Sequence, residues 1–170
     1  MVLDIAAIQY IYGPSVYNHD DTTYRFDTAR PFARSIWDSG GTDTLDFSNF
    51  DNDCTVNIEP GAYSTIVCRD WILTDNLGIA YGAIIENVIG GTGNDTVTGN
   101  SVDNSLSGGP GNDILYGGGG DDYLFGTAGD NTLDGGTGTD IAIFSGNQAD
   151  YSITELIGFG GQNTSTNYNP

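Results

Sequence analysis

The stretch GGPGNDILYGGGGDDYLFG, from Gly108 to Gly126, contains the pattern GGxGxD twice, nine residues apart. Divided into nines from Gly90, the chain reads GGTGNDTVT, GNSVDNSLS, GGPGNDILY, GGGGDDYLF, GTAGDNTLD and GGTGTDIAI, six units that end at Ile143. A fixed short period is typical of a repeat architecture and decides the fold. The eighth position of every unit is apolar: Val97, Leu106, Leu115, Leu124, Leu133 and Ala142.

Each nine-residue unit has room for one turn and one short strand. A three-residue strand at the end of the unit places the eighth side chain inward and its two neighbours outward, because side chains alternate along a strand. Two units then make one coil of 18 residues, and successive coils stack about 4.8 Å apart through strand pairing. The repeats therefore predict a parallel β-roll of about three such coils, which needs capping structure at both ends.

The flanking sequence does not share this period. We expect an all-β chain in which the roll stacks on an upstream β-strand region, with a short N-terminal helix from the N-cap Asp4 to the stop at Gly13 and a turn at Pro60-Gly61. The expected boundaries are a helix over 1–13, a polar loop over 14–34, a capping β-strand region over 35–89, the roll over 90–146, and a C-terminal strand with a flexible tail over 147–170.

The charge of the chain is strongly negative. Asp and Glu outnumber Lys and Arg by 23 to 4, which gives a formal net charge of -19. Such a chain repels nucleic acid and anionic membranes, so neither partner is expected. A hydrophobic content of 38% is too high for a solvated acidic tail, so the acid needs a counter-ion, and divalent metal is the natural candidate.

No apolar run is long enough to span a membrane, and the chain does not start like a secretory signal peptide. We therefore expect either export without a cleaved signal or a piece of a longer protein. The two cysteines, Cys54 and Cys68, match no common zinc spacing. A disulfide between them is the favoured interpretation, and two free buried thiols are the alternative.

The turn sequence suits calcium. Glycine adopts positive φ, so the turn can curl its carbonyl oxygens inward, and the sixth-position Asp adds a carboxylate. Calcium takes six to eight hard oxygens, more than one turn supplies, so an ion between turns stacked 18 residues apart should use both. The expected pairs are Asp95 with Asp113, Asp113 with Asn131, Asn104 with Asp122, and Asp122 with Asp140, whereas Asp103 and Asp130 should face solvent.

This pattern resembles the calcium-binding nonapeptide of RTX proteins. The alternative, a metal-free array of glycine turns, would leave stacked carboxylates without a counter-ion. The candidate ligands in the repeats are Gly91, Gly93, Asp95, Asn100, Asn104, Gly108, Gly109, Gly111, Asp113, Gly117, Gly118, Gly120, Asp122, Gly129, Asn131, Gly136, Gly138 and Asp140.

Three upstream segments, LDIAAIQYIYG, IWDSGGTDTLDFS and IIENVIGGTGND, together resemble the C-terminal region of the serralysin family of secreted bacterial zinc proteases. The resemblance implies calcium ligands at Asp38, Gly40, Gly41 and Asp43, closed by the loop around Asp21 and Thr22. It also implies that Glu86 pairs with the turn at Asn104. Several calcium ions, a covalently attached N-terminal catalytic domain, the type I secretion apparatus and an extracellular location are further implications.

The sequence offers no catalytic centre of its own. The zinc site of that family needs HExxH and a third histidine, whereas the only histidine here is His19, in a polar loop where solvent exposure is expected. There is no GxSxG motif and no Lys for a phosphate loop. We therefore expect the chain not to be an enzyme.

Two functions remain open. The first is a module that folds on extracellular calcium and supports export and stability of an attached catalytic domain, such as a serralysin-like metalloprotease. The second is an adhesion or glycan-binding module, for which the outward-facing Tyr116, Tyr123 and Phe125 offer an aromatic surface, although these rings could instead pack on each other or on the upstream strands.

Overall fold

The computed structural model describes residues 18–68, residues 73–145 and the strand at 164–168. The helix expected over residues 1–13 and the strand expected directly after the repeats lie outside these residues. Every regular element among the described residues is a β-strand. In this part of the chain no helix is long and apolar enough to cross a membrane.

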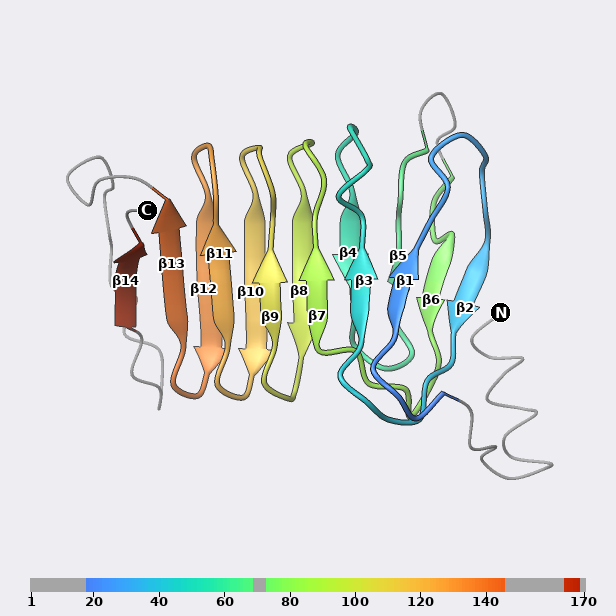
Figure 1. Ribbon diagram of the computed structural model, residues 1–170, viewed down its shortest axis with the longest axis horizontal. Coiled ribbons are helices and arrows are strands. Elements are labelled where there is room, and N and C mark those ends of the chain that lie inside the picture. The colour runs from blue at the N-terminus through green and yellow to red at the C-terminus, as the bar shows by residue number, and fades with distance from the viewer. Residues whose placement is uncertain (1–17, 69–72, 146–163, 169–170) are drawn as a thin grey trace.

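The molecule is a stack of coils with one row of parallel strands on each side (Figure 1). One row is a seven-stranded sheet in the order β1-β3-β7-β9-β11-β13-β14, and the other is a four-stranded sheet in the order β12-β10-β8-β4. The strands of the first row are β1 Thr23–Arg25, β3 Thr44–Asp46, β7 Asn87–Ile89, β9 Ser105–Ser107, β11 Tyr123–Gly126, β13 Ile141–Ser145 and β14 Thr164–Tyr168. Those of the second row are β4 Thr55–Asn57, β8 Thr96–Asn100, β10 Ile114–Gly119 and β12 Thr132–Thr137.

A small third sheet widens the upstream end of the stack. It has the order β2-β6-β5, with β5 and β6 antiparallel, and the turn expected at Pro60-Gly61 precedes β5. Gly61 there has φ +90°, a conformation that favours glycine. The strands are β2 Arg34–Ile36, β5 Tyr63–Ser64 and β6 Leu77–Ile79.

Two columns of apolar side chains form the core of the roll. Partners in the strand register are 18 residues apart within the repeats, so eighth-position residues stack directly, as Leu106 does on Leu124. Side chains in the middle of the stack are at most 1% exposed, whereas Leu133, near the downstream end, is only half-buried. The columns are Tyr24, Leu45, Val88, Leu106, Leu124 and Ala142 on one side, and Val56, Val97, Leu115 and Leu133 on the other.

The predicted fold class, an all-β parallel roll, is confirmed, and the six repeats form three coils. The structure adds that upstream strands continue the same sheets. Residues 38–46, 81–89 and 49–57 each place a turn and a strand in register with the repeats, although few of their turn residues are glycine. The upstream region is thus partly an extension of the roll as well as its cap.

Aromatic rings pack at the upstream end. Phe26 stacks between Phe32 and Phe47, with ring centroids 4.9 Å and 5.2 Å away, and Phe50 meets Phe47 edge-on at 5.8 Å. The Arg34 guanidinium lies 5.9 Å from the centroid of the Phe26 ring. Such pairs add stability beyond their buried area, so this end of the core is held by side-chain packing.

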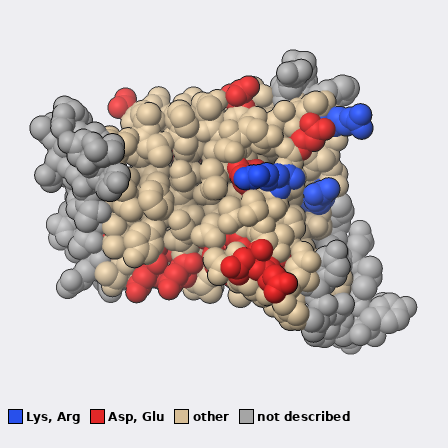
Figure 2. All heavy atoms as spheres, in the orientation of Figure 1, with Lys and Arg blue, Asp and Glu red and all other residues tan. Residues whose placement is uncertain are grey.

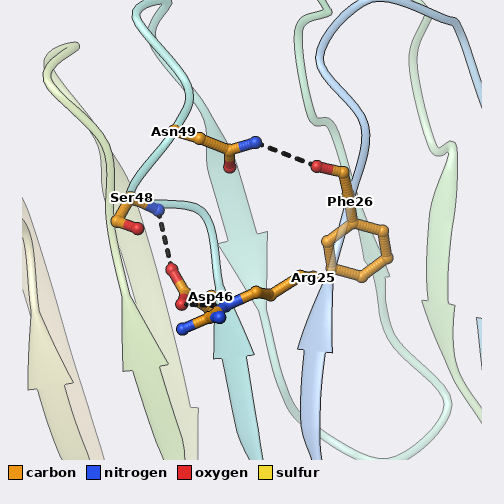
Figure 3. Close-up of polar contacts among 5 residues, drawn as sticks. All are labelled: Arg25, Phe26, Asp46, Ser48 and Asn49. Carbon is orange, nitrogen blue, oxygen red and sulfur yellow. Dashed lines mark hydrogen bonds and ion pairs between the residues drawn. The ribbon is translucent and has the colours of Figure 1, made fainter.

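An ion pair joins the first two strands of the large sheet on its outer face (Figure 3). Arg25 Nε donates to Asp46 Oδ2 at 2.7 Å, and the Ser48 N–H donates to Asp46 Oδ1 at 3.0 Å. Burial alone would raise the pKa of Asp46, but these hydrogen bonds outweigh it and hold that pKa below its ordinary value. Asn49 Nδ2 also donates to the Phe26 carbonyl, which fixes the chain beyond β3.

The two cysteines are free and buried, so the structure shows the alternative to the favoured disulfide. Burial raises the pKa of the Cys54 thiol to about 12 and also raises that of Cys68. Since the thiolate is the reactive form, both side chains should be inert while the fold is intact.

The polar tail differs from the sequence-based expectation of flexibility. Residues 164–168 form β14, which pairs in parallel with β13. The physical reason is that the outermost strand of a sheet presents unpaired N–H and C=O groups, and an extended segment can satisfy them whatever its hydrophobicity.

The core columns predict a sharp contrast between neighbouring positions. Leu115 is fully buried and Ile114, on the opposite face of the same strand, is 36% exposed. Leu115→Ala should lower the free energy of unfolding by about 2–5 kcal/mol, because it leaves a cavity that a stacked core cannot fill.

Urea unfolding with calcium present measures this change, and Ile114→Ala is the matched control, expected to cost less than about 1 kcal/mol. Equal losses for the two variants would contradict the inward-facing column.

Candidate metal sites in the stacked turns

The sixth-position side chains link each turn to the turn one coil earlier; we call the contact between two such stacked turns a joint. The Asp95 N–H donates to Asp113 Oδ1 at 2.8 Å and the Asp113 N–H donates to Asn131 Oδ1 at 2.8 Å. On the other side the Asn104 N–H donates to Asp122 Oδ1 at 2.7 Å and the Asp122 N–H donates to Asp140 Oδ1 at 3.0 Å. The four pairs expected from the sequence are therefore brought together.

The same ladder runs upstream of the repeats. The Thr22 N–H donates to Asp43 Oδ1 at 2.8 Å, and the Asp43 N–H donates to Glu86 Oε2 at 2.7 Å. On the opposite side, the Cys54 N–H donates to Asp95 Oδ1 at 2.8 Å. Cys54 thus takes the place of a sixth-position Asp, which the sequence did not reveal because its turn lacks glycine.

Some ladder carboxylates keep one oxygen without a hydrogen-bond partner. Asp43, Asp113 and Asp122 are at most 1% exposed, and Oδ2 of each is buried and unpaired in the part of the chain that the structure describes. A buried acceptor without a partner costs free energy, and a charged one costs more. These oxygens are where a cation would contribute most.

The turn glycines bring backbone carbonyls close to the same joints. Gly109 has φ +90°, and a Cβ there would overlap the carbonyl oxygen of Gly91 in the turn below. Gly136, with φ +88°, stands in the same relation to the carbonyl of Gly118. The spacing repeats through the remaining turns: Gly93 lies under Gly111, Gly111 under Gly129, Asn100 under Gly118, and Gly120 under Gly138, and Gly108 and Gly117 lie against the carboxylates of Asp113 and Asp122.

The loop region upstream forms a related cluster. Gly41 lies against the backbone of residues 20–21, and the Gly40 N–H donates to Asp38 Oδ1 at 3.2 Å. Asp38 is buried, and the Tyr24 hydroxyl donates to its Oδ2 at 2.5 Å. The structure therefore gathers the four upstream candidates and the Asp21–Thr22 loop, and it adds Tyr24, which the sequence did not single out.

Burial and mutual repulsion act on the protonation of these acids. Burial, reinforced by Asp38 and Glu86, raises the pKa of Asp43 to about 6. Burial and the neighbouring acids, Asp140 first, raise the pKa of Asp122 to about 6. Burial also raises the pKa of Asp95 and Asp113. At neutral pH these groups carry charge at a cost, which a bound cation would offset.

The fifth-position residues form a second, outer ladder. Asp103 and Asp130 are exposed, as expected, and the Asp121 N–H donates to Asp103 Oδ1 at 2.8 Å. His19 is exposed too, as expected for a loop histidine. Among the described residues no three His, Cys, Asp or Glu side chains converge into a metal-binding cluster, so backbone carbonyls would have to complete each coordination shell.

The charges are separated along the molecule. In Figure 2 acidic atoms lie mainly along the upper and lower edges, where Figure 1 places the turns, and basic atoms gather over the upstream end. The described basic residues there are Arg25, Arg30 and Arg34. Most of the repeat region therefore has no cation of its own to balance the turns.

Comparison with known proteins gives consistent relatives. Residues 4–154 match the family described as peptidase M10 serralysin C terminal. The chain is 44% identical over 108 residues to Serralysin C of Dickeya chrysanthemi and 42% identical over 120 residues to Metallopeptidase AprA of Pseudomonas marginalis. A serralysin of Photorhabdus laumondii is 42% identical over 116 residues. These alignments cover 56%, 62% and 61% of this chain but only 22%, 24% and 23% of the relatives.

The raised pKa values predict how pH acts on the metal-free protein. An acid whose folded pKa lies near 6, against 3.8 ordinarily, holds its proton more tightly when folded. The stability of the metal-free fold should therefore fall as pH rises from about 4 to about 6 and stay low above that. In chelator, β-sheet circular dichroism should be stronger at pH 5 than at pH 7.5.

The variant Asp122→Asn should reduce that difference, since its side chain does not titrate. An equal or stronger sheet signal at pH 7.5 in chelator would contradict the prediction.

Proposed function

Since the chain belongs to the family of peptidase M10 serralysin C-terminal domains, we propose that it is a calcium-binding β-roll module that folds when it meets calcium. The observation that supports this most is the set of buried, unpaired carboxylate oxygens on Asp43, Asp113 and Asp122. Each lies in a joint between stacked turns that also carries backbone carbonyls.

The donor set suits calcium among the common ions. Carboxylate and carbonyl oxygens are hard ligands, which calcium accepts in larger numbers and looser geometry than magnesium does. Zinc and copper prefer nitrogen or sulfur ligands, and the turns offer neither. Asp113 and Asp122 would hold ions between the repeat turns, together with the carbonyls of the turn below. Asp38, Asp43 and Glu86 would hold ions upstream, with carbonyls from the loop around residues 20–22.

Calcium then couples folding to location. Without the ion, the stacked acids repel each other, and glycine-rich turns lose more conformational entropy on ordering than other sequences do. Ligand that binds only the folded state adds its binding free energy to stability. The chain would stay largely unfolded where calcium is scarce, which suits export through a narrow type I secretion channel, and would fold outside the cell.

We further propose that the native partner is a covalently attached N-terminal catalytic domain. The chain spans about a quarter or less of the length of the relatives it matches, which are called serralysins and metallopeptidases. In this role the roll is a non-catalytic module that supports the stability of a metalloprotease and its secretion.

One observation favours a second candidate function, adhesion to a surface or a glycan. Tyr116 is 42% exposed and Tyr123 is 48% exposed, so both rings face outward as expected, and Phe125 beside them is half-buried. Exposed aromatic rings on a rigid sheet can stack on sugar rings. A glycan array with and without calcium, comparing the chain with Tyr116→Ser and Tyr123→Ser, separates this role from the first.

Calcium removal tests the proposed function directly. A chelator at neutral pH should remove most of the β-sheet circular dichroism, and added calcium should restore it. Asp122→Asn should raise the calcium concentration at the midpoint roughly tenfold, because it removes one ligand charge from a buried site.

Asp121→Asn is the matched control, since Asp121 is exposed and next in sequence, and it should shift the midpoint by much less. A spectrum unchanged by the chelator would sink the proposal.

The buried thiols provide an independent readout of the same transition. In calcium, Cys54 and Cys68 should resist alkylation by iodoacetamide at pH 8, because they are buried and their pKa values are raised. In chelator their labelling rate, followed by mass spectrometry, should rise by at least about tenfold. Fast labelling in both conditions would mean that the upstream core opens regardless of calcium.

A further inference from the structure

One joint of the ladder is built from amides instead of carboxylates. It lies between residues 85–86 and the turn at 99–104, where the upstream region meets the repeats. Asn100 and Asn104 are both 3% exposed or less, and both belong to this turn. In the other units the corresponding positions carry mainly Gly and Asp.

The two amides bind the carbonyls of the turn below. Asn100 Nδ2 donates to the Ile85 carbonyl at 2.7 Å, and Asn104 Nδ2 donates to the Glu86 carbonyl at 3.2 Å and to Asn100 Oδ1 at 3.3 Å. The amide oxygens are occupied as well. Asn104 Oδ1 accepts from the Asn100 N–H at 2.9 Å, and Asn100 Oδ1 accepts from the Val102 N–H at 3.1 Å.

The carboxylate of Glu86 does not contribute to this joint through its described hydrogen bonds. Its Oε2 accepts from the Asp43 N–H at 2.7 Å, which directs it toward the coil before. The next joint along differs sharply, because Asp122 Oδ2 is buried there without a partner. An amide N–H donor and a bound cation satisfy a carbonyl in equivalent ways, so the two kinds of joint meet one demand by different chemistry.

We propose that the Asn100–Asn104 amide pair closes this joint in place of a calcium ion. The inference rests on the proposed function, in which the neighbouring joints do bind calcium. It also replaces the expectation that Glu86 and Asn104 share an ion: Glu86 serves the upstream site, and Asn104 donates hydrogen bonds where a ligand would accept charge.

The opposite side of the same coil is similar. Asp95 accepts from the Cys54 N–H through Oδ1 and from the Gly91 N–H at 2.9 Å through Oδ2, so both of its oxygens have protein donors. The first repeat coil is therefore attached to the upstream core by hydrogen bonds on both sides. Its turns form a seat on which ions fill the later joints.

Two substitutions of the same kind test the amide joint in the full chain. Asn104→Asp and Asn131→Asp each change a sixth-position Asn to the acid found in the other repeats. In saturating calcium, Asn104→Asp should lower the melting temperature by about 4–10 °C, since it loses two buried donors and faces carbonyl oxygens. Asn131→Asp, at a partly exposed joint whose amide contacts only the Gly129 carbonyl, should leave it unchanged or raise it.

A melting temperature of Asn104→Asp at or above that of the unmodified chain would overturn the proposal. If that variant does not fold, a crystal structure of the unmodified chain grown in calcium decides. An anomalous calcium peak between Ile85 and Asn104 overturns the proposal, and amides bonded to these carbonyls without a peak support it. Equilibrium dialysis of the unmodified chain with calcium tests the proposed function separately, because that measurement does not depend on the amide joint.

Discussion

The burial of carboxylate oxygens between stacked turns is the constraint on which the rest of the structure depends. A parallel stack forces the same position of successive coils into line, so one acid per turn becomes a column of acids. Backbone N–H groups satisfy one oxygen of each, as between Asp95 and Asp113. The second oxygen of Asp113 and Asp122 has no protein donor. The hydrophobic columns inside the roll can form only if this charge at its edges is neutralised, which makes the core conditional on the turns.

The sequence predicted those parts of the molecule in which one residue type repeats at one spacing. The eighth-position leucines and the sixth-position acids fixed the strands, the inward face and the pairs one coil apart. These predictions succeed because in a solenoid each unit contacts mainly its neighbours, so local pattern and tertiary contact coincide. The exposed Asp103 and Asp130 follow from the same logic, since a shift of one residue along the turn exchanges inside and outside.

The upstream half was less predictable because different residues there play the same structural parts. Phe50 and Asn52 lie beneath Gly91 and Gly93, and Cys54 takes the place of a sixth-position acid. No glycine spacing marks that turn, so only strand register identifies it. Likewise Asn100 and Asn104 were expected to be ligands from their position, whereas their amide groups reach the carbonyls of residues 85–86. Position predicts where a side chain lies, but donor or acceptor chemistry decides what it binds.

The register of 18 residues also constrains how the length of such a chain can change. Insertion or loss of one nine-residue unit would move every later turn to the opposite side of the stack and set Asp122 above Asp95 in place of Asn104. Loss or gain of two units keeps both columns and both ladders in phase. The roll can therefore grow or shrink without new design of its core, but only in whole coils, and each added coil brings its own demand for cations.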